Sequence, residues 1–310
     1  MKKHKKKMTW LEAAGLGVLG VFGLSLCITM LLQGTQIPLM SPKGFISGEQ
    51  HSLMVVSTLI MVGFAALVLA ALYFFAWKYR ETNDKAEFNA AAGRSKKLLA
   101  LAWGSPILVF ILLASIMLPA TQRLEPQRSI ASTEDQITIR VIAMRWKWVF
   151  LYPDHDVATV NFVQIPVDTP IRFELSADEA PMNSFWIPHL GGMLYAMTEH
   201  VNPLNLMATE VGDYNGGAAE INGRGFAGMR FTTRVSSEKD FEEWIERAAQ
   251  SPDELDAAAY DKLLEPSENN QVAIYHSPTN QEIFSDMLKK YAGGSHSHYK
   301  LPENTGHEGH

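Results

Sequence analysis

The sequence of 310 residues has a single cysteine, Cys27, which lies inside an apolar run. A disulfide needs a cysteine pair and cysteine-based metal sites need several thiolates, so neither can form within this chain. The net charge of −6 lacks the basic excess that nucleic-acid binding requires, so no nucleic acid is expected as a partner. Nucleotide-binding and nucleophile motifs are also missing. Gly223, Gly225 and Gly228 match G-x-G-x-x-G, but a strand is predicted to follow them instead of a helix.

Long apolar runs are confined to the first 121 residues, where three stretches carry no charge: 13–32, 52–77 and 98–121. A helix needs about 20 apolar residues to cross a bilayer core, and each stretch is long enough. We expect a transmembrane hairpin within residues 35–121, with helices at about 52–77 and 98–121. Residues 1–34 are interpreted as a signal or an uncleaved signal-anchor helix, and cleavage or lipid attachment at Cys27 stays open.

Lysine and arginine gather on one side of these stretches. Five lysines occur in the first seven residues, and six basic residues lie between 78 and 97, in the loop of the predicted hairpin. Because such residues stay in the cytoplasm, residues 122–310 are expected on the outer side. The apolar stretches contain no ionisable residue, so we interpret the hairpin as a docking surface for a larger membrane subunit rather than a proton path.

Alternating hydrophobicity begins at Gln136 and predicts a mostly β domain over residues 122–235. Trp146, Trp148, Phe150 and Tyr152 fall on one face of a predicted strand. Further short strands are expected at 160–165, 171–175, 204–209 and 229–234, separated by turn residues that include Gly212-Asp213 and Asn215-Gly216-Gly217. Many short strands at this spacing favour a β-sandwich or barrel.

Helical periodicity returns after Ser236 and predicts a C-terminal helical segment over residues 236–291, in three pieces. Residues 292–310 are polar and rich in histidine, and we expect a disordered tail. Weak binding of stray metal by His296, His298, His307 and His310 is the alternative.

Four segments carry a resemblance to a known family: RWKWVFLYP at 145–153, MNSFWIP at 182–188, the loop 218–229, and PSENNQV at 266–272. Together they resemble subunit II of the haem-copper respiratory oxidases, and the cytochrome bo-type ubiquinol oxidase branch most closely. The resemblance spans roughly residues 40 to 290. It implies a membrane helical hairpin, preceded by an N-terminal apolar helix or signal, and followed by an all-β cupredoxin-like domain with C-terminal helices.

In the cytochrome c oxidase branch, two cysteines, two histidines, a methionine and a glutamate carbonyl hold a binuclear copper centre in this domain. Copper of that kind needs soft thiolate sulfur, which alanine and asparagine do not provide. The resemblance therefore implies no metal, cofactor or catalytic residue on this chain, with haems and copper on a partner subunit I. The matching positions here are Asn183, Ala218, Glu220, Asn222, Phe226 and Met229.

Two further positions were weighed against the family pattern. The face with Trp146 and Trp148 has two readings: in the copper-bearing branch, aromatic residues here lie near the electron entry point, and otherwise large aromatic residues on one strand face simply pack. A contact of Trp146 and Trp148 with another subunit is compatible with either reading. Leu99 stands where many members of the family carry a glutamate near the mouth of a proton-uptake path, so proton entry is arranged differently or falls to another subunit.

The sequence thus predicts subunit II of a proton-pumping quinol oxidase, which oxidises quinol and reduces O2 to water in a bacterial inner membrane. The chain would be a non-catalytic, structural or assembly subunit with its large C-terminal domain in the periplasm. Its expected partners are subunit I, the smaller membrane subunits, the lipid bilayer and the quinol that the complex binds. The alternative is a free-standing, membrane-anchored binding module that kept the cupredoxin fold.

Overall fold

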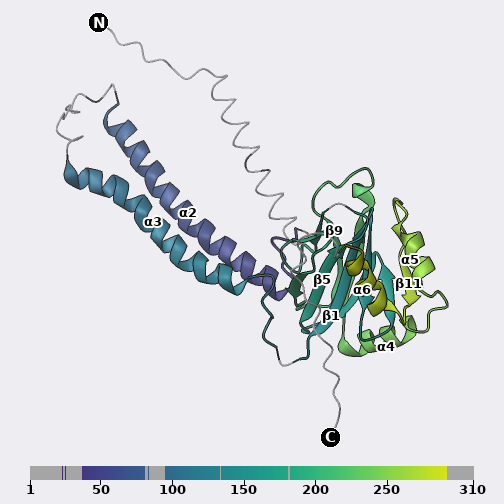
Figure 1. Ribbon diagram of the computed structural model, residues 1–310. Helices are drawn as coiled ribbons and strands as arrows, with labels where there is room; N and C mark the ends of the chain where they lie inside the picture. The colour runs from purple at the N-terminus through teal and green to yellow at the C-terminus, as the bar shows by residue number, and fades with distance from the viewer. Residues whose placement is uncertain are drawn as a thin grey trace. The chain divides into compact units, whose positions relative to one another are not determined.

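A computed structural model describes residues 23, 25, 37–80, 83, 95–132, 134–180 and 182–291. The chain divides into two units, Met1–Pro42 and Lys43–His310. The predicted first helix, apart from residues 23 and 25, and the predicted tail at 292–310 lie outside the described residues. The second unit contains a pair of long helices, a β domain and three shorter helices (Figure 1).

The predicted hairpin helices are present as α2 (Phe45–Lys78) and α3 (Lys96–Arg123), and both are long and apolar enough to cross a membrane. Helix α2 begins seven residues before the expected start at 52. Its first two turns contain polar residues such as Glu49 and His51, which an apolar run does not include. Ser47 fixes this early start: its Oγ donates to the Gly44 carbonyl at 2.9 Å and accepts from the Gly44 N–H at 3.1 Å.

The β domain is built of two sheets, as the β-sandwich prediction requires. The first has the strand order β11-β3-β2-β1-β5-β8 and the second β4-β10-β9-β6-β7. The strands of the first sheet are β1 (Ile137–Met144), β2 (Lys147–Tyr152), β3 (Val157–Val160), β5 (Ile171–Ala177), β8 (Asn202–Leu206) and β11 (Ala273–His276). Those of the second are β4 (Phe162–Pro166), β6 (Asn183–Trp186), β7 (Leu194–Ala196), β9 (Gly212–Ala218) and β10 (Arg230–Ser236).

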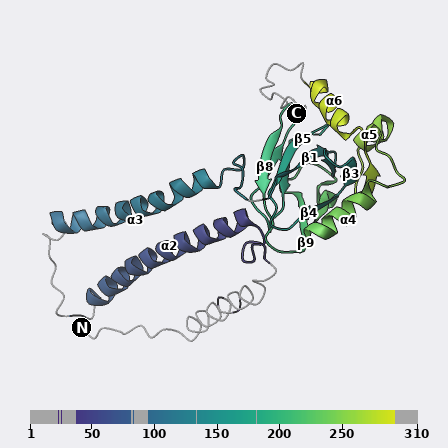
Figure 2. The same ribbon diagram turned by 90° about the horizontal axis from the view of Figure 1, so that it is seen from below.

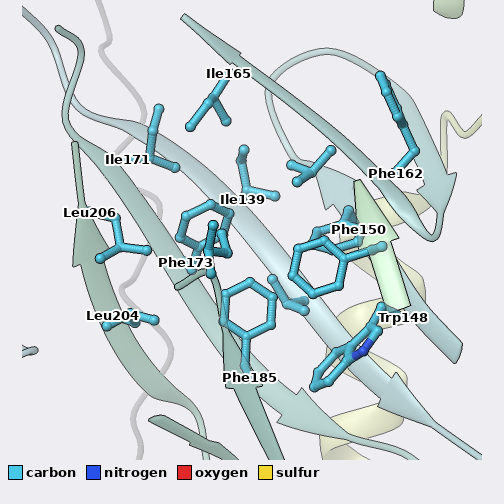
Figure 3. Close-up of a cluster of buried hydrophobic side chains, with 14 of the residues drawn as sticks. Ile139, Trp148, Phe150, Phe162, Ile165, Ile171, Phe173, Phe185, Leu204 and Leu206 are labelled. Carbon is cyan, nitrogen blue, oxygen red and sulfur yellow. The ribbon is translucent and has the colours of Figure 1, made fainter. Parts of the chain in front are cut away.

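The main core lies between the two sheets and is rich in aromatic rings (Figure 3). Trp148 and Phe150 of β2 point to the same side and meet Phe185 of β6 with ring centroids 5.3 and 6.3 Å apart. Val149 and Leu151, on the other face of β2, belong to a second apolar cluster under the C-terminal helices. The strand is therefore buried on both faces. Its alternating side chains point into two different cores, not into one core and the solvent.

The predicted C-terminal helices are present as α4 (Glu238–Ala248), α5 (Ala257–Leu264) and α6 (Asn280–Tyr291) (Figure 2). Between α5 and α6 the chain also forms β11, which pairs antiparallel with β3. The three predicted helical pieces are thus present, and the prediction did not include the strand between them. A four-residue edge strand has too little sequence to show a period of its own.

Two further expectations are corrected. Trp146 was predicted within a strand, but it occupies the turn between β1 and β2 with a φ of 67°. Residues 212–217 were read as turns, yet they form most of β9. Gly216 belongs in that strand because the Phe231 ring of the neighbouring β10 covers it: a Cβ at Gly216 would come within 2.2 Å of Cζ of Phe231.

The start of α2 is joined to the β domain by main-chain hydrogen bonds. The N–H of Lys43 donates to the His189 carbonyl at 2.8 Å, and that of Phe45 to the Met207 carbonyl at 2.9 Å. Ile46, in the first turn, belongs to the main core. The first turn of α2 is therefore packed as part of the β domain, and no separate linker joins the two.

Candidate functional site

The positions aligned with copper ligands converge at one end of the second sheet. Asn183 opens β6 and Ala218 closes β9, and these strands pair with Phe185 opposite Ala218. The chain from Glu220 to Met229 forms a loop with one short 3-10 helix, η2 (Phe226–Gly228), and returns into β10.

Asn222 connects three of these positions. Its Nδ2 donates to Oδ1 of Asn183 and, at 3.0 Å, to Sδ of Met229. Asn183 and Met229 are only 2% and 1% exposed, so these are buried polar contacts. Hydrogen bonds of this kind hold the loop against β6 through an amide pair and a thioether.

The remaining positions are used differently. Glu220 Oε1 accepts a 2.6 Å hydrogen bond from the hydroxyl of Tyr195, and this bond raises the pKa of Tyr195. The N–H groups of Ala219 and Glu220 donate to Oγ of Ser184 at 2.8 and 2.7 Å. Phe226 lies in η2 and offers only hydrocarbon. None of these atoms is a thiolate or an imidazole.

The donor set was tested against a binuclear copper centre by its chemistry. It contains one thioether, two carboxamides and the carbonyl and carboxylate of Glu220. Nδ2 of Asn222 is already bound to the side chains of Asn183 and Met229, and Glu220 Oε1 to the Tyr195 hydroxyl. Amides and a lone thioether are weak copper ligands and cannot bridge two copper ions as thiolates do. The residues present therefore do not fit the copper centre that the family pattern places here.

The side chain of Trp146 packs against this loop. Its indole lies over Gly223 and Gly225: a Cβ on Gly225 would come within 2.4 Å of Trp146 Cγ, and one on Gly223 within 3.1 Å of Cζ2. Gly223 also has a φ of +126°, which side-chain-bearing residues rarely adopt. Two glycines of the apparent dinucleotide motif are thus explained by the Trp146 ring above them, and the third, Gly228, lies against Asn269.

Trp148 is fully buried, and its ring packs edge-to-face on Phe185 and Phe231. None of the Trp148 side chain reaches the surface, so this residue packs in the core of the β domain. Trp146 is partly exposed, so a contact there stays a prediction. The two tryptophans lie on different elements, and the periodicity that grouped them missed the turn.

A cavity of about 380 Å³ lies beside the loop. It is lined by Met144, Arg145, Trp146, Ala180, Asn183 and Asn222. Oδ1 of Asn222 is buried there and, among the described residues, has no hydrogen-bond partner. The cavity can hold small polar molecules such as water, and its polar lining consists of amides and one guanidinium.

Sequence reasoning missed the residues whose hydrogen bonds and ion pair hold the loop and Trp146 in place. Asn161 Nδ2 donates to the Asn270 carbonyl at 3.0 Å, and Asn270 Nδ2 reaches the Trp146 carbonyl at 3.4 Å. Arg224 pairs with Glu268 at 2.6 Å. In the sequence, the PSENNQV segment is informative only as part of the family resemblance. Its unusual polarity before β11 was the signal that it binds neighbouring main chain.

Within the described ranges, no group of three or more His, Cys, Asp or Glu side chains gathers as a metal site would require. This says nothing of the histidines at 296–310, which the description does not include.

Comparison with known proteins gives consistent relatives. The model of the COX Aromatic Rich Motif family matches residues 249–295, the stretch that contains α5, β11 and α6. Cytochrome bo(3) ubiquinol oxidase subunit 2 of Pseudomonas putida is 39% identical over 277 residues, which cover 89% of this chain and 86% of that relative. Ubiquinol oxidase subunit 2 of Acetobacter aceti is 36% identical, with 86% of each chain covered.

Among solved structures, the periplasmic domain of subunit II of cytochrome oxidase from Bradyrhizobium japonicum is similar to this chain at 23% identity. It covers 38% of this chain and 96% of its own, with a TM-score of 0.35.

Proposed function

The chain belongs to the family of subunit 2 of the cytochrome bo(3) ubiquinol oxidases, and on that premise we propose that it acts as subunit II of a proton-pumping quinol oxidase without a redox centre of its own. Quinol oxidation and reduction of O2 to water would take place on subunit I, which would carry the haems and copper. This chain would dock on subunit I and the smaller membrane subunits and stabilise their assembly.

One observation carries the absence of a redox centre in this proposal. Where a copper relay would need thiolates and imidazoles, Asn222 binds Asn183 and Met229 in a network of amides and a thioether. Electrons that come from a membrane quinol need no copper relay on the outer side. The donor chemistry of the loop therefore supports a subunit that shapes the complex and carries no electrons.

The hairpin supports the docking role. Large apolar side chains are exposed along α2 and α3, among them Leu67, Tyr73, Trp103 and Phe110, each at least 67% exposed. Lipid can cover such faces, and so can the helices of another subunit. By the same proposal residues 35–121 form the anchor, 122–235 the periplasmic β domain and 236–291 its C-terminal extension. Residues 1–34 would be the signal or signal-anchor helix, and 292–310 a disordered tail.

Metal analysis tests the missing redox centre. The full-length chain, purified in detergent without partners and dialysed against copper, is expected to hold far less than one copper per chain. It should also show no absorption in the visible or near-infrared region. A stoichiometric, coloured copper species would refute this part of the proposal.

Co-purification tests the subunit role. An affinity-tagged chain, extracted from its native membranes in mild detergent, is expected to bring haem with it in a fixed ratio. A chain that elutes alone, with no haem spectrum, would favour a free-standing binding module instead.

A further inference from the structure

The C-terminal segment contains a groove that the proposed function does not use. It lies between α5 and α6 and has a volume of about 360 Å³. Its apolar lining comes from Ala257 and Leu264 of α5 and from Ile283 and Met287 of α6. The spacings of seven along α5 and four along α6 place these side chains in one line on each helix.

Acidic residues surround this apolar strip. The groove is lined by six carboxylates and one lysine, Lys290. The six are Asp178, Glu254, Asp256, Asp261, Glu282 and Asp286. All except Asp178 are exposed. An apolar strip between two acidic rims is complementary to a segment with apolar residues on one face and basic residues beside them.

The lysine is already engaged within the chain. Lys290 Nζ binds Asp178 at 3.0 Å and Glu179 at 2.7 Å. Asp178, only 1% exposed in its side chain, also accepts hydrogen bonds from the hydroxyls of Tyr260 and Tyr291 at 2.8 and 2.7 Å. The polar groups at the base of the groove are therefore satisfied within the chain, although one ammonium faces two carboxylates there.

The rim has fewer partners. Asp286 pairs with Lys289 at 2.7 Å, and Asp256 caps α5 by accepting from the Ala259 N–H at 2.8 Å. Among the described residues, no lysine or arginine forms an ion pair with Glu254, Asp261 or Glu282. These three carboxylates are available to an incoming cationic side chain.

We propose that the groove between α5 and α6 docks a basic, amphipathic segment of a separate protein outside the membrane. Helix α5 has eight residues, about 12 Å at the rise of an α-helix, so about two turns of a partner helix fit along it. Ile283 and Met287 are buried within the chain, so the partner's apolar side chains would cover Ala257 and Leu264. Its lysines or arginines would reach the rim. This docking does not depend on the proposed oxidase function.

Site-specific cross-linking tests the proposal in the full-length chain in its native membranes. A photoreactive phenylalanine derivative replaces Ala257, which lines the groove. In a matched control it replaces Ala258, the next residue of α5, which is exposed but does not line it. The expected result is a cross-link from position 257 only. Its peptide should come from another protein and carry at least two lysines or arginines among apolar residues.

A charge-matched pair of variants separates docking from general electrostatics. With the probe at 257, E254Q/D261N/E282Q should lower the cross-link yield about tenfold, the effect of losing three exposed ion pairs. E238Q/E242Q/E246Q removes three exposed carboxylates from α4 and should change the yield less than twofold. Circular dichroism melting checks that both variants stay folded. Equal yields in the two variants, equal cross-linking from 257 and 258, a peptide without basic residues, or a cross-link within the same chain would each overturn the proposal.

Discussion

At the residue scale, the side chain of Asn222 does what a metal would do in a copper-bearing domain. It ties the loop 219–229 to Asn183 on β6 and to Met229 before β10. A hydrogen-bonded amide can hold such a loop in place, but it cannot change oxidation state.

Replacing Asn222 by alanine should therefore loosen the loop without unfolding the domain. The loss of donors to Asn183 and Met229 is expected to cost about 1 kcal/mol of unfolding free energy. Hydrogen exchange should speed up in residues 219–229, while β2 stays protected. Asn215→Ala, on an exposed position of β9, serves as the control. Unchanged hydrogen exchange in the loop would show that the packing of Trp146 on the glycines is enough to hold the loop in place.

A second residue-scale prediction concerns pH. Burial lowers the pKa of His189, and the nearby Lys43 ammonium lowers it further. Its Nδ1 is buried without a hydrogen-bond partner among the described residues. The unfolded chain therefore binds a proton at a pH where the folded chain does not, so stability falls as the pH drops below about 6.5.

The loss of stability between about pH 7 and 5 should be smaller in His189→Phe, which keeps an aromatic ring beside Tyr214 and cannot titrate. Melting of the full-length chain in detergent, measured across this range, checks the difference. His200→Asn is the matched control and should retain the wild-type slope. A His189→Phe slope equal to the wild type would assign the pH dependence to other groups.

At the scale of elements, β9 shows how packing overrides local preference. Its glycines favour turns, yet Gly216 lies beneath the Phe231 ring, where no larger residue fits. Gly216→Ala is expected to destabilise the domain by about 1–3 kcal/mol through overpacking.

The double variant G216A/F231L should recover part of that loss, because the shorter side chain leaves room for the new methyl group. Gly48→Ala, on the surface of α2 with nothing within 4 Å of the added Cβ, should not destabilise the chain. Chemical denaturation of the wild type, G216A, F231L and G216A/F231L gives the coupling energy between positions 216 and 231. If the unfolding free-energy changes of the two substitutions simply add in the double variant, the Phe231 ring is not what excludes the methyl group.

At the scale of the whole molecule, the distribution of basic residues predicts the orientation in the membrane. Lys78 ends α2 and Lys96 begins α3, so both lie at the hairpin end that is expected in the cytoplasm. The β domain follows α3 and should lie in the periplasm.

Labelling of engineered cysteines tests this orientation. In a Cys27→Ser background, a cysteine in place of Glu268 should react with a membrane-impermeant maleimide in spheroplasts. One in place of Lys96 should react only after the membrane is opened. The reverse pattern would contradict the proposed topology.

The helical anchor, the change to β structure near residue 136 and the chemistry of the loop could all be predicted from the amino-acid sequence. These features follow from amino-acid composition and hydrophobic periodicity. A bilayer requires a long uncharged run, a half-buried strand requires alternating hydrophobic residues, and a copper centre requires sulfur and imidazole ligands. The family resemblance then indicated which six positions belong together, and the sheet places them at one end.

The side chains that each strand faces depend on the packing of the folded chain and could not be predicted in this way. Trp148 lies in the core and Trp146 in a turn, although both fit one period-2 pattern. Gly216 is a strand residue because of a ring that is distant in sequence, and β11 exists because β3 offers it an edge. Such contacts join residues far apart along the chain, and a local pattern contains no information about them.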